Sequence, residues 1–371
     1  MFLRRASVLL IALGMTGFTF LMAGPRAGLL VLVGIGFGLV LEGLRFGFAG
    51  PWRMIVTERD GRGLIAQLIA IALVAVVAFP LLAASPGELA PAHAPVGIAM
   101  ILGAFVFGMA MQLVMGCGSG TLVNAGSGNL VGLIALAGFI GGSFAGTLHL
   151  GWWTGLGALP VVSLQGIAGA QGGLVLTLLG LATVGGIALS RSAPGKRLPP
   201  RRLWIAAALI AALALANLVI AGQPWGIVYG LGLWGAKLAE AGGADLAQTA
   251  FWAADANATR LSASILTDVT SLTNIGLLIG AFAVMRWRAE PGVPTQALTW
   301  ASYGAVLLAA LVLGYSARLA FGCNVGAFFS GISTGSLHGW VWLVAAFAGS
   351  TLGIRLRPIL LRPDPARGVY A

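Results

Sequence analysis

Charge is the scarcest property of this sequence. Of its 371 residues only 10 are Asp or Glu, and charged residues of both signs together make up 8%. Soluble globular proteins carry roughly a quarter of their residues as charged side chains, which they need to cover a surface exposed to water. The sequence therefore excludes a soluble enzyme or soluble binding module, and its 58% hydrophobic residues indicate that lipid is the solvent.

Potential metal ligands and redox motifs are also scarce. The chain has three His and two Cys. His93, His149 and His338 have no second ligand at a spacing typical of a metal site, so we expect no metal. There is no C-x-x-C pair and no motif that indicates a haem or quinone. We therefore expect no cofactor.

Long apolar runs recur from one end of the chain to the other. A helix needs about 20 apolar residues to cross a bilayer, and these runs lack the alternation of barrel strands. The sequence therefore predicts an all-α polytopic transmembrane bundle, with the first run retained as a helix rather than removed as a signal peptide. The predicted spans are 6–23, 27–48, 63–84, 96–115, 129–148, 172–190, 203–221, 272–286, 299–317 and 337–354, with shorter apolar pieces at 151–167 and 224–241.

The net charge of +11 reflects membrane topology rather than nucleic-acid binding. Nearly all of the basic residues lie at the ends of apolar runs, and no soluble module gathers them into a patch. They cluster at 45–62, 191–202 and 355–367, whereas 85–95 and 149–171 contain none. By the positive-inside rule, this distribution predicts that both termini face the cytoplasm.

The chain divides into two similar halves at a basic, proline-containing linker, residues 191–202. We treat 1–371 as one membrane domain, with half-repeats at 27–190 and 203–357. The segment QLVMGCGSG, which contains Cys117, and the segment RLAFGCNVG, which contains Cys323, match as x-L-x-x-G-C-x-x-G. Because the two copies follow spans that run in opposite predicted directions, we expect an inverted repeat with its substrate site at the interface of the halves.

The repeated Gly-Cys motifs are the most specific chemical feature of the sequence. Glycines on both sides of a cysteine predict a broken or re-entrant helix, and such backbone is tolerated at membrane depth only inside protein or beside a cavity. A helix start there would suit an anion. Hydroxyl and amide donors follow each cysteine, at Ser119, Thr121, Asn124, Ser127, Asn324, Ser330, Ser333 and Thr334. The predicted pathway residues are Gly116, Cys117, Gly118, Ser119, Gly120, Arg318, Gly322, Cys323, Asn324 and Gly326.

Each of these residues also has a simpler interpretation. A cysteine can be a small buried hydrophobic residue, and a Ser or Thr in a membrane helix often bonds to its own backbone. Arg318 could anchor its helix at the interface as readily as attract anions. Asp60 and Asp268 are best interpreted as capping residues, Glu42 could pair with Arg45, and Trp342 is predicted in an interfacial belt.

Several segments resemble the YeeE/YedE family of sulfur-transport membrane proteins. They are GCGSG, QPWGIVYGLGLWGAK from residue 223, TDVTSLTNIG from residue 267, and SARLAFGCNVGAFFSGISTGSLHGWVWLVAAFAGSTLG from residue 316. The resemblance implies a bacterial inner-membrane protein that takes up thiosulfate or a closely related small sulfur anion, with Cys117 and Cys323 in the pathway. It also implies a cytoplasmic TusA-type sulfurtransferase as partner. Family members often have a further cysteine where this chain has Gly47.

Other functions stay open at this point. The two cysteines could form a membrane thiol–disulfide or persulfide redox pair, the substrate could be a selenium species, or the chain could be an assembly subunit of a larger complex. We expect a transporter rather than an enzyme, with no nucleic acid among its partners.

Overall fold

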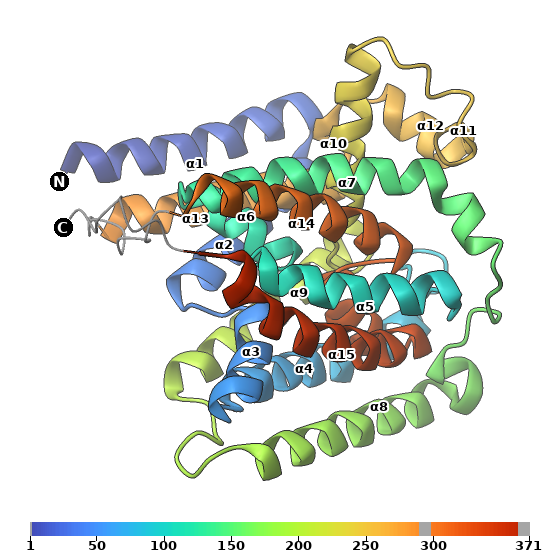
Figure 1. Ribbon diagram of the computed structural model, residues 1–371. Helices are drawn as coiled ribbons and strands as arrows, with labels where there is room; N and C mark the ends of the chain where they lie inside the picture. The colour runs from blue at the N-terminus through green and yellow to red at the C-terminus, as the bar shows by residue number, and fades with distance from the viewer. Residues whose placement is uncertain (1, 289–297, 363–371) are drawn as a thin grey trace.

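The computed structural model describes residues 2–288 and 298–362, and there the chain is built from helices joined by turns and loops (Figure 1). The elements are α1 (Phe2–Ala23), α2 (Pro25–Gly43), α3 (Ala49–Glu58), α4 (Arg62–Ala84), α5 (Ile98–Leu113), α6 (Gly118–Gly126), α7 (Leu130–Thr154), α8 (Leu164–Arg191), α9 (Arg201–Ala221), α10 (Val228–Ala241), α11 (Ala250–Ala253), α12 (Asp255–Ser262), η1 (Ile265–Thr267), α13 (Val269–Arg288), α14 (Trp300–Leu319), η2 (Asn324–Gly331) and α15 (Leu337–Leu360).

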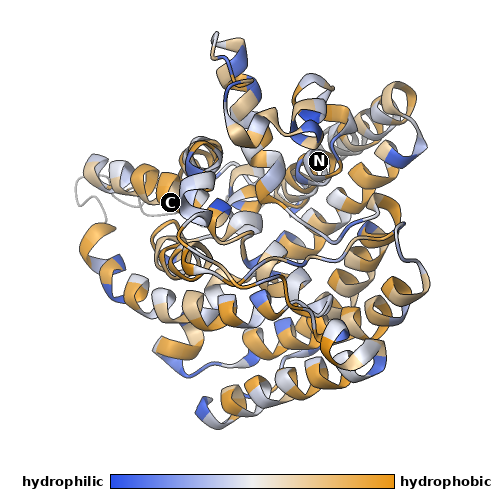
Figure 2. Cartoon of the chain, turned by 90° about the vertical axis from the view of Figure 1, so that its right-hand side faces the viewer, coloured by the Kyte–Doolittle hydropathy of each residue, from blue (hydrophilic) through white to orange (hydrophobic). Residues whose placement is uncertain are grey.

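The protein is a multi-pass membrane protein. Within residues 2–288 and 298–362, nine helical segments are long and apolar enough to cross a bilayer. Hydrophobic residues occur on the outer as well as the inner helices of the bundle, as the orange segments of Figure 2 show. Leu179, Leu308 and Val344 are 60%, 65% and 71% exposed. Such surfaces are stable in lipid, where apolar exposure has no hydrophobic cost.

The core is made of three closely packed, parallel helix pairs: α2 with α13, α5 with α15, and α7 with α14. Glycine allows these close approaches. A methyl group at Gly280 would collide with the carbonyl oxygen of Ile35, and one at Gly142 would collide with that of Leu311. Because lipid provides no hydrophobic force between helices, close backbone contact of this kind is a main source of their association.

The helices α5 and α14 pack against each other in opposite directions at the centre. Gly103, near the start of α5, lies against Ser316 and Ala320 at the end of α14. Around this core, α2 also packs against α9, and α4 against α8 and α9. Figure 1 shows α1 and α8 at opposite edges of the bundle, outside the central pairs.

Several predicted boundaries were wrong. The span predicted at 27–48 ends at Gly43, because Arg45 adopts a left-handed conformation with φ 51° that stops the helix. The short helix α3 follows it and was not predicted. The apolar piece predicted at 151–167 and the span predicted at 172–190 are divided differently, since α7 continues to Thr154 and α8 already begins at Leu164.

Two side-chain predictions were also wrong. Glu42 pairs with Arg288 at 3.7 Å, not with Arg45. Trp342 is fully buried against Trp52 and Phe107 instead of lying in an interfacial belt. In both cases the partner comes from a helix distant in sequence, so the local sequence pattern does not indicate it.

Candidate functional site

Both cysteines lie in breaks between helices. The helix α5 ends at Leu113 and α6 begins directly after Cys117, while α14 ends at Leu319 and η2 begins directly after Cys323. Each cysteine has extended backbone and forms the N-cap of the following short helix. These short helices have 9 and 8 residues, well below the length of about 20 that crosses a bilayer.

The two breaks have the same backbone conformation. Two residues before each cysteine stands a left-handed residue, Met115 with φ 60° and Phe321 with φ 54°. Non-glycine residues adopt this conformation uncommonly, so the shared strain indicates a turn fixed by its surroundings. The hydrogen bonds also match: Gly116 N to Met111 O (3.1 Å), Gly322 N to Ala317 O (2.9 Å), Thr121 N to Cys117 O (2.8 Å) and Ala327 N to Cys323 O (2.8 Å).

Each sulfur faces backbone amides at the start of its short helix. The amides of Ser119 and Gly120 donate toward the sulfur of Cys117. Those of Val325 and Gly326 donate toward the sulfur of Cys323. These are the free N–H groups of a helix start, and they carry the partial positive charge of the helix dipole. An anion bound beside the sulfur, or at the position the sulfur occupies, could accept hydrogen bonds from the same N–H groups.

The cysteines from the two halves are brought together in the interior. Cys117 is 1% exposed and Cys323 is fully buried, and both are free thiols. A Cβ atom built on Gly118 would lie 2.8 Å from the sulfur of Cys323, closer than real carbon atoms approach. The missing side chain of Gly118 therefore makes room for Cys323 directly beside Cys117.

Buried polar atoms without hydrogen-bond partners gather around the cysteines. Asn324, next to Cys323, is fully buried, and neither its amide nitrogen nor its carbonyl oxygen has a partner in the described chain. The hydroxyl of Thr121, on the first turn of α6, is likewise buried and unpaired there. Because an unpaired buried polar group costs about 1–3 kcal/mol, these groups are candidates for binding a polar ligand.

Arg318 lies in the last turn of α14, and its side chain contacts residues of α10 and α11. Its Nη2 donates to the carbonyl of Val228 at 3.3 Å, and its guanidinium lies 5.2 Å from the ring centre of Phe251 and 5.7 Å from that of Tyr229. Its Nε has no partner, and no carboxylate in residues 2–288 and 298–362 forms an ion pair with it. Its positive charge is thus balanced only by carbonyl and aromatic contacts.

The other predicted residues have varied surroundings. Ser119 Oγ lies 3.3 Å from the sulfur of Cys117, and a Cβ on Gly120 would be 3.9 Å from that sulfur. A Cβ on Gly326 would meet no atom within 4 Å, which indicates open space beside Cys323. Gly116 and Gly322 instead allow the backbone just before each cysteine to pack closely against the short helix that follows it.

Sequence reasoning did not identify the partners of Arg318, because α10 and α11 reach it only through the tertiary fold.

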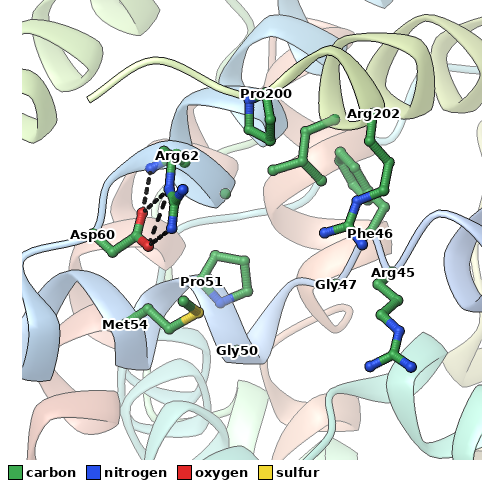
Figure 3. Close-up of a pocket in the computed structure, with 12 residues that line it drawn as sticks. Arg45, Phe46, Gly47, Gly50, Pro51, Met54, Asp60, Arg62, Pro200 and Arg202 are labelled. Atoms are coloured by element: carbon green, nitrogen blue, oxygen red, sulfur yellow. Dashed lines mark hydrogen bonds and ion pairs between the residues drawn. The ribbon is translucent and has the colours of Figure 1, made fainter. Parts of the chain in front are cut away.

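The capping roles of two acids are confirmed. Asp268 accepts a hydrogen bond from the Ser271 amide at 2.7 Å, and Asp60 accepts one from the Arg62 amide at 3.1 Å. The side chain of Arg62 also donates to Asp60 (Figure 3), and these bonds hold the pKa of the Asp60 carboxyl below its ordinary value.

Comparison with known proteins gives one family and two relatives. The family described as "Sulphur transport" matches residues 44–352. The chain is 30% identical over 156 residues to the "Probable transporter YedE" of Escherichia coli K12, an alignment that covers 41% of this chain and 37% of the relative. It is 29% identical over 177 residues to the Salmonella typhimurium LT2 protein of the same description, covering 46% of this chain and 42% of that protein. The alignments thus span less than half of either relative.

Proposed function

The chain belongs to the sulphur-transport family of membrane proteins, and from that premise we propose that it takes up thiosulfate, or a closely related small sulfur anion, along a central pathway past Cys323 and Cys117. The observation that carries the proposal is the contact of Cys323 with Gly118, which joins the two Gly-Cys turns in the buried interior. A structural cysteine pair would not require matched strained turns or unpaired polar groups beside the thiols.

The groups around the thiols suit a partly dehydrated anion. Stripping water from a charged ion is costly unless hydrogen-bond donors replace the water. Backbone amides of both short helices, the amide nitrogen of Asn324 and the hydroxyl of Thr121 supply such donors. Each thiol adds a weak S–H donor, which is polarizable and therefore compatible with a terminal sulfur. Several weak sites let the ion leave as well as enter.

Arg318 is the proposed entry residue. It lies on the outer side of the cysteine pair in the topology proposed below, and it has no acidic partner in the described chain. A cation there raises the local concentration of anions before they lose their water. Its contacts with Tyr229 and Phe251 hold the guanidinium in place without neutralising it.

We further propose that the two halves form an inverted pseudo-repeat. Helix contacts that exchange the halves support this: α7 packs on α14 as α15 packs on α5, and α2 packs on α13 as α9 packs on α4. The pairs α5 with α14 and α2 with α9, whose members would be equivalent, pack on each other. The opposite directions of α5 and α14 agree with inversion. In this arrangement α6 and η2 are re-entrant helices entering from opposite faces.

The proposed location is the bacterial inner membrane with both termini in the cytoplasm. The supporting observation is the gathering of arginines at one end of the bundle, in the loops before α4 and α9 and at the ends of α13 and α15. Released anion would then reach a cytoplasmic acceptor, for which a TusA-type sulfurtransferase is the proposed partner.

The test uses a bacterium that lacks thiosulfate uptake, grown on thiosulfate as sole sulfur source. It carries the wild-type gene, Cys117→Ala, Cys323→Ala, or Val123→Ala as a truncation control in α6, at matched membrane levels. Purified proteins in liposomes are assayed for uptake of radiolabelled thiosulfate, with sulfate, selenosulfate and unlabelled thiosulfate as competitors. We expect wild type and Val123→Ala to import thiosulfate and both cysteine variants to lose at least about tenfold in rate, since each loses one donor of a shared site.

Other results would favour the rival functions. Full uptake by both cysteine variants would remove the thiols from the mechanism. A redox pair would be favoured by a different result. The cysteine variants would lose uptake while their remaining thiol still reacts with disulfide reagents, and the wild-type thiols would react with these reagents in only one redox state. Stronger competition by selenosulfate than by thiosulfate would reassign the substrate. No uptake by wild-type liposomes would contradict transport by this chain alone and favour an assembly subunit.

A further inference from the structure

The segment that follows α10 has a hydrophobic cluster of its own, separate from the main core of the bundle. Figure 1 shows α11 and α12 at the edge of the molecule, next to α10. The cluster members are at most 7% exposed and come from α10 and this segment: Leu233, Ala236, Leu246, Trp252 and Leu261. Proteins open locally in cooperative units, and units with few buried contacts open most readily. Residues 243–263, which we call the outer lid, have the properties of such a unit.

The two ends of the outer lid differ in how they are held. At the first end, Gly243 has φ 91°, and a Cβ there would meet no atom within 4 Å. At the second end, Lys237 of α10 donates to the carbonyl oxygens of Leu261 and Ala263, which fixes that joint. Between the ends, α11 and α12 have only 4 and 8 residues, and residues 253–256 are exposed. The outer lid is thus a short segment with one fixed and one loose joint.

In this structure the outer lid lies closed over Arg318. The ring centre of Phe251, in α11, is 5.2 Å from the guanidinium carbon, and that of Tyr229, in α10, is 5.7 Å from it. Asn257 of α12 joins these two residues, because it accepts from the Tyr229 hydroxyl and donates to the Phe251 carbonyl, both at 2.9 Å. The Nε of Arg318 is buried. The closed lid therefore covers part of the guanidinium that is proposed to attract anions.

A buried hydrogen bond fastens the outer lid to the bundle. Trp252 Nε1 donates to Thr147 Oγ1 of α7 at 2.9 Å, and both residues are at most 2% exposed. The helix α10 is held to the bundle by a bond of the same type, from Trp234 Nε1 to Ser271 Oγ of α13, also at 2.9 Å. The two tryptophans donate equally short bonds, and only the bond of Trp252 reaches from the lid. Trp234 therefore provides a matched control.

We propose that the outer lid is a gate, which opens to expose Arg318 to a small anion and closes over it again. This inference rests on the proposed function, because that function makes Arg318 the entry residue, but opening of the lid can be measured without substrate. A ligand that binds only the open state has its apparent affinity reduced by the open fraction of the molecules. Loosening the lid should therefore strengthen apparent affinity, whereas damage to a binding site would weaken it.

The first measurement is amide hydrogen–deuterium exchange of the purified full chain in detergent. It compares the wild type with Trp252→Phe, Thr147→Val, the double variant and Trp234→Phe. We expect amides of α11 and α12 to exchange about fivefold faster in both single variants, because each loses the fastening bond. The double variant should match the single variants, since the two residues share one bond. Trp234→Phe should leave exchange of the lid unchanged.

The second measurement is thiosulfate uptake by liposomes that contain the same variants. In Trp252→Phe and Thr147→Val the half-saturating thiosulfate concentration should fall by about the factor by which exchange rises, at an unchanged maximal rate. Thermal unfolding of every variant verifies that the fold persists. The two single variants break the bond from opposite sides, so either one can test the proposal if the other fails to fold.

Three results would overturn the gate. Lid amides that exchange as slowly as those of α7 and α14 would show that the lid opens only with the whole bundle. Equal acceleration by Trp234→Phe would show general loosening. Faster exchange without a fall in the half-saturating concentration would separate the lid from entry, with transport itself intact. If wild-type liposomes import no thiosulfate, the proposed function fails by itself, and exchange still decides whether the lid opens.

Discussion

Asn324 combines a stability cost with a proposed role in binding. Its side chain is fully buried, and both of its polar atoms lack partners among the described residues. We expect Asn324→Leu to leave the free energy of unfolding unchanged or raise it by about 1–3 kcal/mol, because the substitution removes unpaired polar atoms. The same change should abolish uptake of thiosulfate, since a donor next to Cys323 is lost. Thermal unfolding in detergent and liposome uptake measure the two effects.

Asn217→Leu is the control for that substitution. Asn217 is 3% exposed, and its amide donates to the carbonyl of Gln223 at 3.0 Å. Here the replacement leaves a buried acceptor without its donor, so we expect a loss of about 1–3 kcal/mol in stability. A loss of stability in Asn324→Leu equal to that in Asn217→Leu would show that Asn324 has a structural rather than a binding role.

Single residues were predictable from the sequence where the signal was local. The capping acids, the two helix breaks and the burial of both cysteines follow from short motifs with a backbone reason. The partners of Glu42 and the burial of Trp342 do not, because Arg288 and Phe107 reach them from other helices. The unpaired state of Asn324 could not be predicted either, since it depends on which hydrogen-bonding groups the neighbouring helices place beside its side chain.

At the scale of elements, the pairing of α2 with α13 depends on glycine. Gly280 lies against the backbone of Gly38 and Ile35, and a methyl group there would collide with the Ile35 carbonyl oxygen. We expect Gly280→Ala to lower the unfolding free energy by about 1–3 kcal/mol or more, because the helices must separate. Thermal unfolding of the detergent-solubilised protein measures the effect.

Gly186→Ala in α8 is the matched substitution. A Cβ at Gly186 meets no atom within 4 Å, so only the better helix propensity of alanine acts there, worth about 1 kcal/mol in favour of the variant. If Gly280→Ala unfolds at or above the temperature of Gly186→Ala, close glycine packing is not what holds the pair together.

Helices as elements were largely predictable from length and hydropathy, and their ends were not. Lipid selects apolar runs, so spans such as 63–84 and 203–221 agree with α4 and α9 within a residue or two. The ends depend on turn geometry. The left-handed Arg45 ends α2 at Gly43, within the predicted span 27–48, although arginine carries no strong preference for that conformation.

The arrangement of the whole molecule was predictable only in outline. The repeated Gly-Cys motif predicts two related halves, yet nothing in it specifies that α5 would lie beside α15 rather than beside its own neighbour α7. The structure gives the physical reason in the glycines of α5 and α15, at Gly108, Gly349 and Gly353, each of which faces a carbonyl oxygen of the opposite helix. Such complementarity between distant helices has no signature in one sequence.

The orientation of the molecule is the last prediction. Arginines gather where α3, α4, α9, α13 and α15 begin or end, whereas α11 and α12 lie at the opposite end. If positive charge faces the cytoplasm, residues of α12 face outward. In a background with both native cysteines replaced by serine, we introduce one new cysteine as Ala256→Cys, in α12, or as Leu198→Cys, in the loop before α9. Both positions are exposed to solvent at their ends of the bundle.

A membrane-impermeant maleimide should label Ala256→Cys in intact spheroplasts and Leu198→Cys only after the membrane is permeabilised. The two variants control for each other, because permeabilised cells must label both. The reverse pattern would place the basic ends of α4, α9, α13 and α15 outside the cell. In that case Arg318 would lie on the cytoplasmic side of the cysteine pair, so the labelling result also decides whether Arg318 can act at the entrance of the pathway.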